Sequence, residues 1–239
     1  MIYLPKTNII ILVMAIIDLF HGSDKIIEKP QFGGGNLHND YGQGFYCTRN
    51  IELAKEWACT GTSDGFANHY AFNLGSLSVL RLNGHGYNIL NWLAILLENR
   101  TFDITGAVPL QAKQYILENF LPDYTKYDVI IGYRADDSYF SFSKAFLNNG
   151  ISLEQLSRAM HLGRLGEQVV IKSEVAFEKL SFMEAVPVQR DIYFPLRAAR
   201  DQEARESFNK MQSAIPVSDA VYVIDILREK WTNNDARLQ

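Results

Sequence analysis

Apolar residues near the start of the chain form two short runs of strand type, separated by a glycine-rich segment. Ile17–Phe20 predicts a strand that ends at Gly22, and the sequence GFYCT at residues 44–48 predicts a second strand. Residues 32–44 contain five glycines, which disfavour both helix and strand. We therefore expect two strands joined by a loop.

Helical spacing of apolar residues follows the second strand. Residues 51–59 place Leu53 and Trp57 four apart, and Thr48 or Asn50 can cap that helix. Residues 88–100 (NILNWLAILLENR) carry the clearest apolar stripe and predict a core helix. Pro109 suits the first turn of a further helix.

The second half of the chain mixes both kinds of element. Strands are predicted at 129–131, 166–173 and 181–188, with two short β runs at 69–84 divided by Gly75. Short helices are predicted at 138–150, 152–163, with Ser152 as N-cap, and 174–180. From Pro195 the chain is mostly helical, and Val221, Ile224, Leu227 and Trp231 would pack one helix face on the domain. This order favours an α+β fold.

The expected organisation is an apolar N-terminal segment over 1–16, a catalytic domain over 17–190 and a helical C-terminal extension over 191–239. The segment 8–17 is too short to span a membrane as a helix, and no small-x-small cleavage site follows it. We interpret it as a buried strand that leads into residues 18–23, and we expect no membrane partner.

Composition narrows the classes of function. The chain has 239 residues and a net charge of −4, so it shows no strongly basic face for unspecific nucleic-acid binding. Cys47 and Cys59 match no metal or redox spacing, which fits a reducing cytoplasm. The five histidines are scattered, and we assign no metal site.

Several motifs in order carry a resemblance. FHGS at 20–23, YGQGFYCT at 41–48 and GEQVVIK at 166–172 resemble ADP-ribosyltransferases of the diphtheria-toxin and poly(ADP-ribose) polymerase type. With NWLAILLENR and YDVIIGYRADD, the region from about Leu19 to Val188 looks like a bacterial family of domains of unknown function within that superfamily.

The resemblance implies split antiparallel sheets flanked by helices, with NAD in the cleft between them. His21 would bond the adenosine ribose, the backbone of Gly22 the nicotinamide carboxamide, and Tyr46 would pack on the nicotinamide ring. Ser23, Gly44 and Phe45 would border the same site. Glu167 would take the position of the catalytic acid, and a shift of one residue would put Gln168 there instead.

Two departures weaken the resemblance. Ala54 stands where the polymerase-type enzymes use a serine, and it has no hydroxyl. Strand alternation puts Glu167 on the face of Val169 and Gln168 on the face of Val170, so only one of the two polar residues can point into a cleft.

Simpler interpretations exist for each motif. His21 and Tyr46 are also consistent with structural residues, and Glu167 with a solvated strand end. Gly33–Gly35 is either a plain flexible loop or one that covers NAD. Arg134, Asp136 and Asp137 either form a polar turn that caps the next helix, which we slightly favour, or meet the acceptor.

The activity implied by the resemblance is cleavage of NAD, release of nicotinamide and transfer of ADP-ribose to a protein or nucleic-acid acceptor. Bacterial members of such small families resemble toxins of toxin–antitoxin, phage-defence or secreted-effector systems, which implies either a neutralising antitoxin or tightly gated activity. The alternatives are an NAD glycohydrolase, an inactive NAD or ADP-ribose binding module, and an interaction protein.

Overall fold

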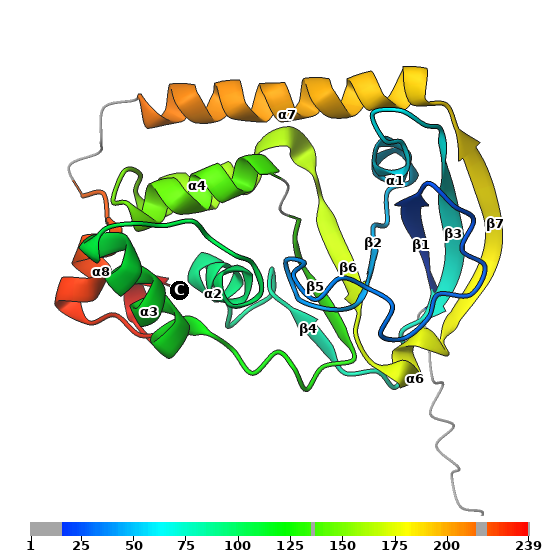
Figure 1. Cartoon of the computed structure of the whole chain (residues 1–239). Coiled ribbons are helices and arrows are strands. Elements are labelled where there is room, and N and C mark those ends of the chain that lie inside the picture. The colour runs from blue at the N-terminus through cyan, green and yellow to red at the C-terminus, as the bar shows by residue number, and fades with distance from the viewer. Residues whose placement is uncertain (1–15, 135–136, 214–218, 239) are drawn as a thin grey trace, which may run out of the picture.

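A computed structural model describes residues 16–134, 137–213 and 219–238, and within these ranges the chain is a mixed α+β structure (Figure 1). The strands are β1 (Ile16–Ser23), β2 (Phe45–Cys47), β3 (Gly65–Asn73), β4 (Val79–Arg81), β5 (Val129–Tyr133), β6 (Glu167–Ile171) and β7 (Leu180–Val188). The α-helices are α1 (Ile51–Ala58), α2 (Ile89–Asn99), α3 (Ala107–Phe120), α4 (Asp137–Leu147), α5 (Leu153–Ala159), α6 (Glu174–Phe177), α7 (Arg190–Gln212) and α8 (Val223–Glu229).

The strands form two small sheets. One has the order β1-β3-β7 and is antiparallel throughout, and the other has the order β2-β6-β5-β4. In the second sheet the β4–β5 pair is parallel, unlike the all-antiparallel arrangement expected from the sequence. The reason is that α2 and α3 lie between these strands in the chain, and such a crossover returns a strand in the same direction.

The second sheet lies in the middle of the molecule. Leu19 and Phe72 of the first sheet pack with Val129 and Val169 of the second in one apolar cluster. On its other face, Val170 joins the largest core, which the helices build. The order is therefore sheet, sheet, helices, as Figure 1 shows from right to left.

Helix α2 is the centre of that largest core, as its apolar stripe predicts. Asn88 caps it, accepting a hydrogen bond from the backbone N–H of Leu90 at 2.9 Å. Nine consecutive residues, Ile89–Leu97, are buried, so the helix is enclosed on all sides rather than on one stripe alone.

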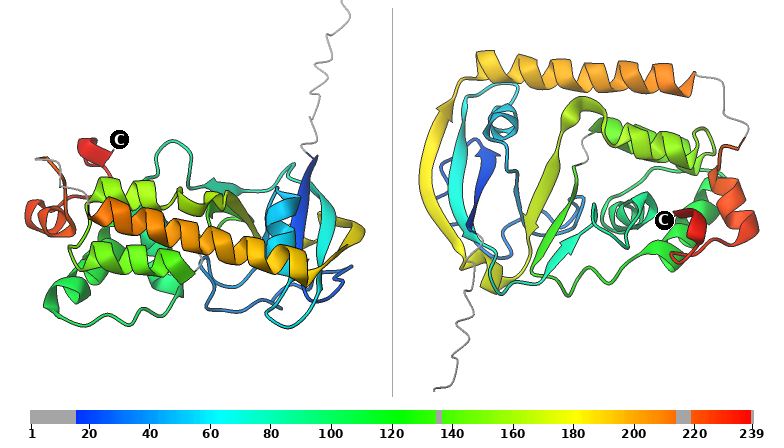
Figure 2. Two further views of the ribbon diagram at one scale, coloured as in Figure 1. Left: turned by 90° about the horizontal axis from the view of Figure 1, so that it is seen from above. Right: turned by 180° about the vertical axis from the view of Figure 1, so that it is seen from behind.

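Helix α7 spans two parts of the molecule. It packs on α1 toward one end and on α4 and α5 toward the other, and Figure 2 shows it extended across both. Arg200 of α7 donates to both carboxylate oxygens of buried Glu56 on α1, at 2.8 and 2.6 Å. The described part of the C-terminal extension is thus joined to α1 by a paired, buried carboxylate.

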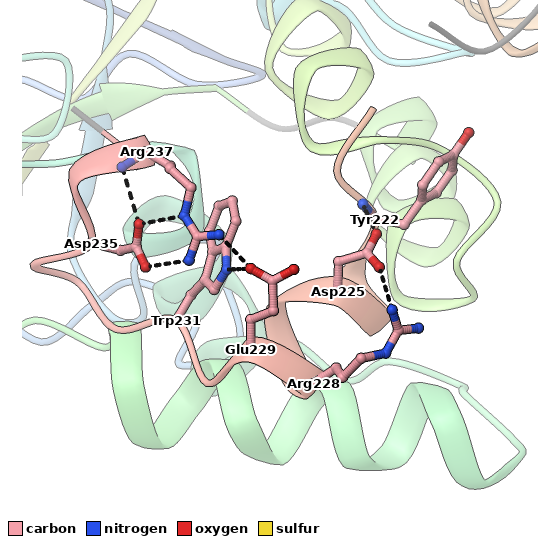
Figure 3. A network of polar contacts seen from close by, with 7 residues as sticks. All are labelled: Tyr222, Asp225, Arg228, Glu229, Trp231, Asp235 and Arg237. Atoms are coloured by element: carbon pink, nitrogen blue, oxygen red, sulfur yellow. Dashed lines mark hydrogen bonds and ion pairs between the residues drawn. The ribbon is translucent and has the colours of Figure 1, made fainter. Parts of the chain in front are cut away.

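The last helix packs on the domain, as expected. Of the four residues predicted to face the domain, Trp231 is buried and Val221 and Leu227 pack against the core, whereas Ile224 is 37% exposed. Val223 and Ile226 are buried in its place, and Val221 and Trp231 lie outside the helix, which spans Val223–Glu229. Figure 3 shows how Arg237 stacks on the Trp231 ring at 3.8 Å and bridges Asp235 and Glu229.

The bounds of several other elements differ from those expected from the sequence. β1 continues through Gly22 to Ser23, because its pairing with β3 extends to Ser23↔Phe66. The two expected β runs are one long strand, β3, and the short β4. Helix α4 begins at Asp137. The predicted cap involves Asp136 and the side chain of Asp137, which lie outside the described residues, as does the apolar segment up to residue 15.

Candidate functional site

Besides their apolar contact, the two sheets are joined by one isolated backbone bridge within the described ranges. Phe20 of β1 and Thr48 exchange two backbone hydrogen bonds, of 2.8 and 2.9 Å. Beside this bridge lies a cavity of about 700 Å³. His21, Tyr46 and Gln168 line it, and they come from β1, β2 and β6. Three of the residues singled out from the sequence therefore meet in one cavity.

The geometry around His21 defines its proton position. Nδ1 lies 2.7 Å from the carbonyl oxygen of Tyr46, which can only accept, so Nδ1 carries the proton. Burial lowers the pKa of His21 below its ordinary value of 6.5, and the charge of Arg134 acts in the same direction. The imidazole is therefore neutral at pH 7, with Nε2 as a hydrogen-bond acceptor.

The phenol of Tyr46 is bound to the neighbouring loop. Its hydroxyl donates to the carbonyl oxygen of Gly42 at 2.5 Å and accepts from the N–H of Tyr41 at 3.0 Å. Lys172 donates to the carbonyl oxygen of Tyr41 at 2.6 Å, and burial lowers its pKa to about 8. Tyr46 thus fixes the loop by its hydroxyl, and its ring remains the part that borders the cavity.

The two polar residues at the start of β6 have different surroundings. Gln168 is 6% exposed and lines the cavity, and its Oε1 has no hydrogen-bond partner among the described residues. Glu167 is exposed, does not line the cavity and accepts a hydrogen bond from Asn83 at 3.0 Å. Alternation along the strand explains the difference, because Val169 faces the other core cluster.

Gly22 borders a second, smaller cavity of about 170 Å³, which shares His21, Tyr46 and Gln168 with the first. A Cβ atom on Gly22 would lie 2.1 Å from the carbonyl oxygen of Ala54, so only glycine fits. Phe20 directs its backbone groups to Thr48, away from β3. Gly22 lies two residues further along the strand, so its N–H and C=O point the same way as those of Phe20, away from β3 and toward the smaller cavity.

Of the remaining residues predicted to border the site, some line the larger cavity and one lies at the surface. Gly44 and Phe45 line the larger cavity, and Phe45 packs against the His21 ring at 4.4 Å between centroids. Ser23 lines neither cavity, and its hydroxyl donates to Asp24 at 3.3 Å. Gly34 and Gly35 border the cavity, so the glycine-rich loop forms part of its wall.

Positive charge dominates the cavity wall. Among the described residues, Lys29, Arg100, Arg134 and Arg197 line it, together with one acid, Asp40, which lies 3.8 Å from Arg100. The guanidinium carbons of Arg134 and Arg197 lie 3.6 and 4.1 Å from the centre of the Trp57 ring. Such a wall is suited to an anionic ligand.

The described residues hold no group of three or more His, Cys, Asp or Glu side chains that could bind a metal ion. None of the helices in the described ranges combines the length and the hydrophobicity needed to cross a bilayer.

Comparison with protein families matches residues 17–182 to a family described as "Protein of unknown function (DUF3990)". The chain belongs to the DUF3990 family. Neither a curated protein nor a solved structure matches the chain. The DUF3990 match contains β1 to β6 and thus His21, Tyr46 and Gln168, whereas Arg197 on α7 lies beyond its end.

Sequence reasoning missed Trp57 and Arg197 as cavity residues. Trp57 resembles the other apolar residues of its helix, and Arg197 lies in a helix rich in charged residues. Nothing in the local pattern marks either residue, because the cavity wall forms only when α7 packs across α1.

Proposed function

We propose that the cavity binds NAD and that the protein cleaves it, releasing nicotinamide and transferring ADP-ribose to an acceptor. The observation that carries this proposal is the meeting of His21, Tyr46 and Gln168, from three separate strands, around one cavity beside the bridge that joins the sheets. The three residues stand in the order of motifs that resembles the ADP-ribosyltransferases.

Each part of NAD would have a matching group. The smaller cavity would take the nicotinamide ring against Tyr46, with its carboxamide on the N–H and C=O of Gly22. This fits the requirement for glycine at residue 22. His21 would accept a hydrogen bond at Nε2 from a hydroxyl of the adenosine ribose, as its neutral state allows.

In the reaction, the bond between ribose C1′ and the nicotinamide nitrogen breaks, and its electron pair goes to that nitrogen. The acceptor's nucleophilic atom then bonds to C1′ and loses its proton to solvent. The sugar carbon passes through an oxocarbenium-like state, which a nearby carboxylate would stabilise. Gln168 offers only an amide dipole there, so we propose slow, single transfer rather than growth of a polymer.

The acceptor in this proposal is a macromolecule, protein or nucleic acid, and the biological role is that of a toxin or defence effector in the cytoplasm with a neutralising antitoxin. Expression without that partner would then arrest growth. His21→Ala would relieve the arrest, and His85→Ala, at an exposed histidine outside both cavities, would not.

A second candidate is a binding module for NAD or ADP-ribose without turnover. The amide of Gln168 in place of a carboxylate favours it, since the site binds a ligand with the same groups but lacks the charge that assists bond cleavage. A glycohydrolase, in which water replaces the acceptor, uses the same cavity.

The test is incubation of the full chain with labelled NAD, alone and with cell extract. Transferase activity predicts free nicotinamide and label on a protease- or nuclease-sensitive species, abolished by His21→Ala and retained by His85→Ala. Gln168→Glu should raise the rate about tenfold, because it adds the missing charge in a water-poor cavity. Nicotinamide without transferred label indicates the glycohydrolase, and thermal stabilisation by NAD without nicotinamide indicates the binding module.

A further inference from the structure

The four arginines of α7 differ in their partners. Arg190 pairs with Asp191 at 2.7 Å, Arg200 with Glu56 at 2.6 Å and Arg205 with Asp201 at 2.8 Å. Around Arg197, the described part of the chain places no carboxylate within ion-pairing distance. Its recorded contact is with the Trp57 ring, at the wall of the large cavity.

The position of Arg197 is unusual for a charged side chain. Arg197 is half-buried, and partly buried charges are normally paired because removal from water disfavours the charged form. Arg134 contacts the same tryptophan ring, so Trp57 holds two guanidinium groups at the cavity wall. The two positive charges repel each other, and an anion bound to both would offset that repulsion by its attraction to each.

The cavity wall supplies the context for that anion. Arg100 lies 3.8 Å from Asp40. Arg134 and Arg197 bring two positive charges to the part of the wall around Trp57. The same cavity carries the aromatic rings of Phe45 and Tyr46. Two guanidinium groups held by one tryptophan, beside further aromatic surface, match a ligand with two linked phosphates and flat rings.

We propose that Arg197 and Arg134, presented by Trp57, bind the diphosphate of a dinucleotide or ADP-ribose-like ligand. This rests on the proposed NAD site and assigns one part of the ligand to residues that the three sequence motifs do not include. Arg197 comes from α7, beyond the segment matched by the DUF3990 family, so the C-terminal helix completes the site instead of only covering it. Arg197 is here a binding residue and takes no part in bond cleavage.

The test is calorimetric titration of the full chain with ADP-ribose, inorganic pyrophosphate and nicotinamide. Arg197→Ala should weaken ADP-ribose and pyrophosphate binding roughly tenfold to a hundredfold, as expected for loss of a charge-assisted contact, and leave nicotinamide binding unchanged. Arg197→Lys should recover part of the affinity, because it keeps the charge but not the fork of donors. Arg205→Ala, on the same helix, is the matched control and should bind like the wild type.

The salt dependence provides a second measurement. Wild-type affinity for pyrophosphate should fall as salt rises, and more steeply than that of Arg197→Ala. Melting temperatures of the variants report whether α7 remains in place. If Arg197→Ala binds ADP-ribose and pyrophosphate as the wild type does, or loses nicotinamide equally, the assignment is wrong.

Failure of the proposed reaction has a different signature. A protein that binds ADP-ribose through Arg197 but releases no nicotinamide from NAD would overturn the enzyme and keep this site. A protein that binds neither ADP-ribose nor pyrophosphate would overturn the diphosphate assignment itself. Nicotinamide release unaffected by Arg197→Ala, with unchanged KM for NAD, would keep the enzyme and remove Arg197 from the site.

Discussion

Two buried side-chain amides, Asn91 on α2 and Gln168 on β6, differ in their surroundings. Asn91, on α2, is 2% exposed, and its Nδ2 donates to Phe120 O at 2.7 Å and to Asn233 Oδ1 at 2.8 Å. Its Oδ1 accepts from the N–H of Asn88 at 2.8 Å. Gln168 is 6% exposed, and its Oε1 has no such partner within the described residues.

This difference separates a structural amide from one available for a ligand. A buried polar group without a hydrogen bond destabilises the folded state, whereas a fully bonded one is close to neutral or favourable. Asn91 joins α2, α3 and the C-terminal segment. Gln168 lies at the wall of a cavity, where a ligand can supply the missing partner.

Removal of the structural amide should have the largest effect. Asn91→Ala leaves the carbonyl of Phe120 and the N–H of Asn88 without their partners and opens a small void. We expect a loss of about 3 kcal/mol in the free energy of unfolding, measured by urea denaturation. Asn148→Ala, at an exposed asparagine on the C-terminal side of α4, should change stability by less than about 0.5 kcal/mol. Equal effects of the two changes would contradict the structural role.

Gln168→Leu should change stability much less, by no more than about 1 kcal/mol in either direction, because no hydrogen bond of Oε1 is lost. In contrast, stabilisation by NAD or ADP-ribose in a thermal shift assay should decrease strongly. A loss of stability as large as that of Asn91→Ala, with ligand response intact, would identify Gln168 as structural.

The smallest expected effect is on the pH dependence of stability. Burial lowers the pKa of His21 below its ordinary 6.5, so the folded chain binds fewer protons than the unfolded chain just below that pH. The contribution of neutral His21 is present above pH 6.5 and is lost as the pH falls through the folded-state value. The difference in unfolding free energy between wild type and His21→Ala should therefore shrink between pH 7 and 5. His85→Ala should show no such trend.

The parts of the fold that could be predicted from sequence depend on local interactions. The Asn88 cap and the apolar spacing define α2, and Ser152 caps α5 by accepting from the N–H of Gln155 at 3.2 Å. Strand alternation separates Gln168 from Glu167 without any tertiary information. These features require only neighbouring residues.

The parts that could not be predicted depend on how distant elements pack. The parallel β4–β5 pair follows from the crossover of two helices, and the burial of Val223 and Ile226 of α8 follows from how that helix packs on the core. Arg197 reaches the cavity because α7 crosses α1, about 140 residues away in the chain, as the Arg200–Glu56 separation of 144 residues indicates. No pattern within α7 distinguishes Arg197 from its paired neighbours.

The most direct test of the central claim is a crystal structure of the protein grown with NAD. The account predicts the nicotinamide ring in the smaller cavity against Tyr46, its carboxamide on the backbone of Gly22, and the diphosphate near Arg134 and Arg197. A dinucleotide bound elsewhere on the molecule, or an empty cavity in crystals saturated with NAD, would contradict it.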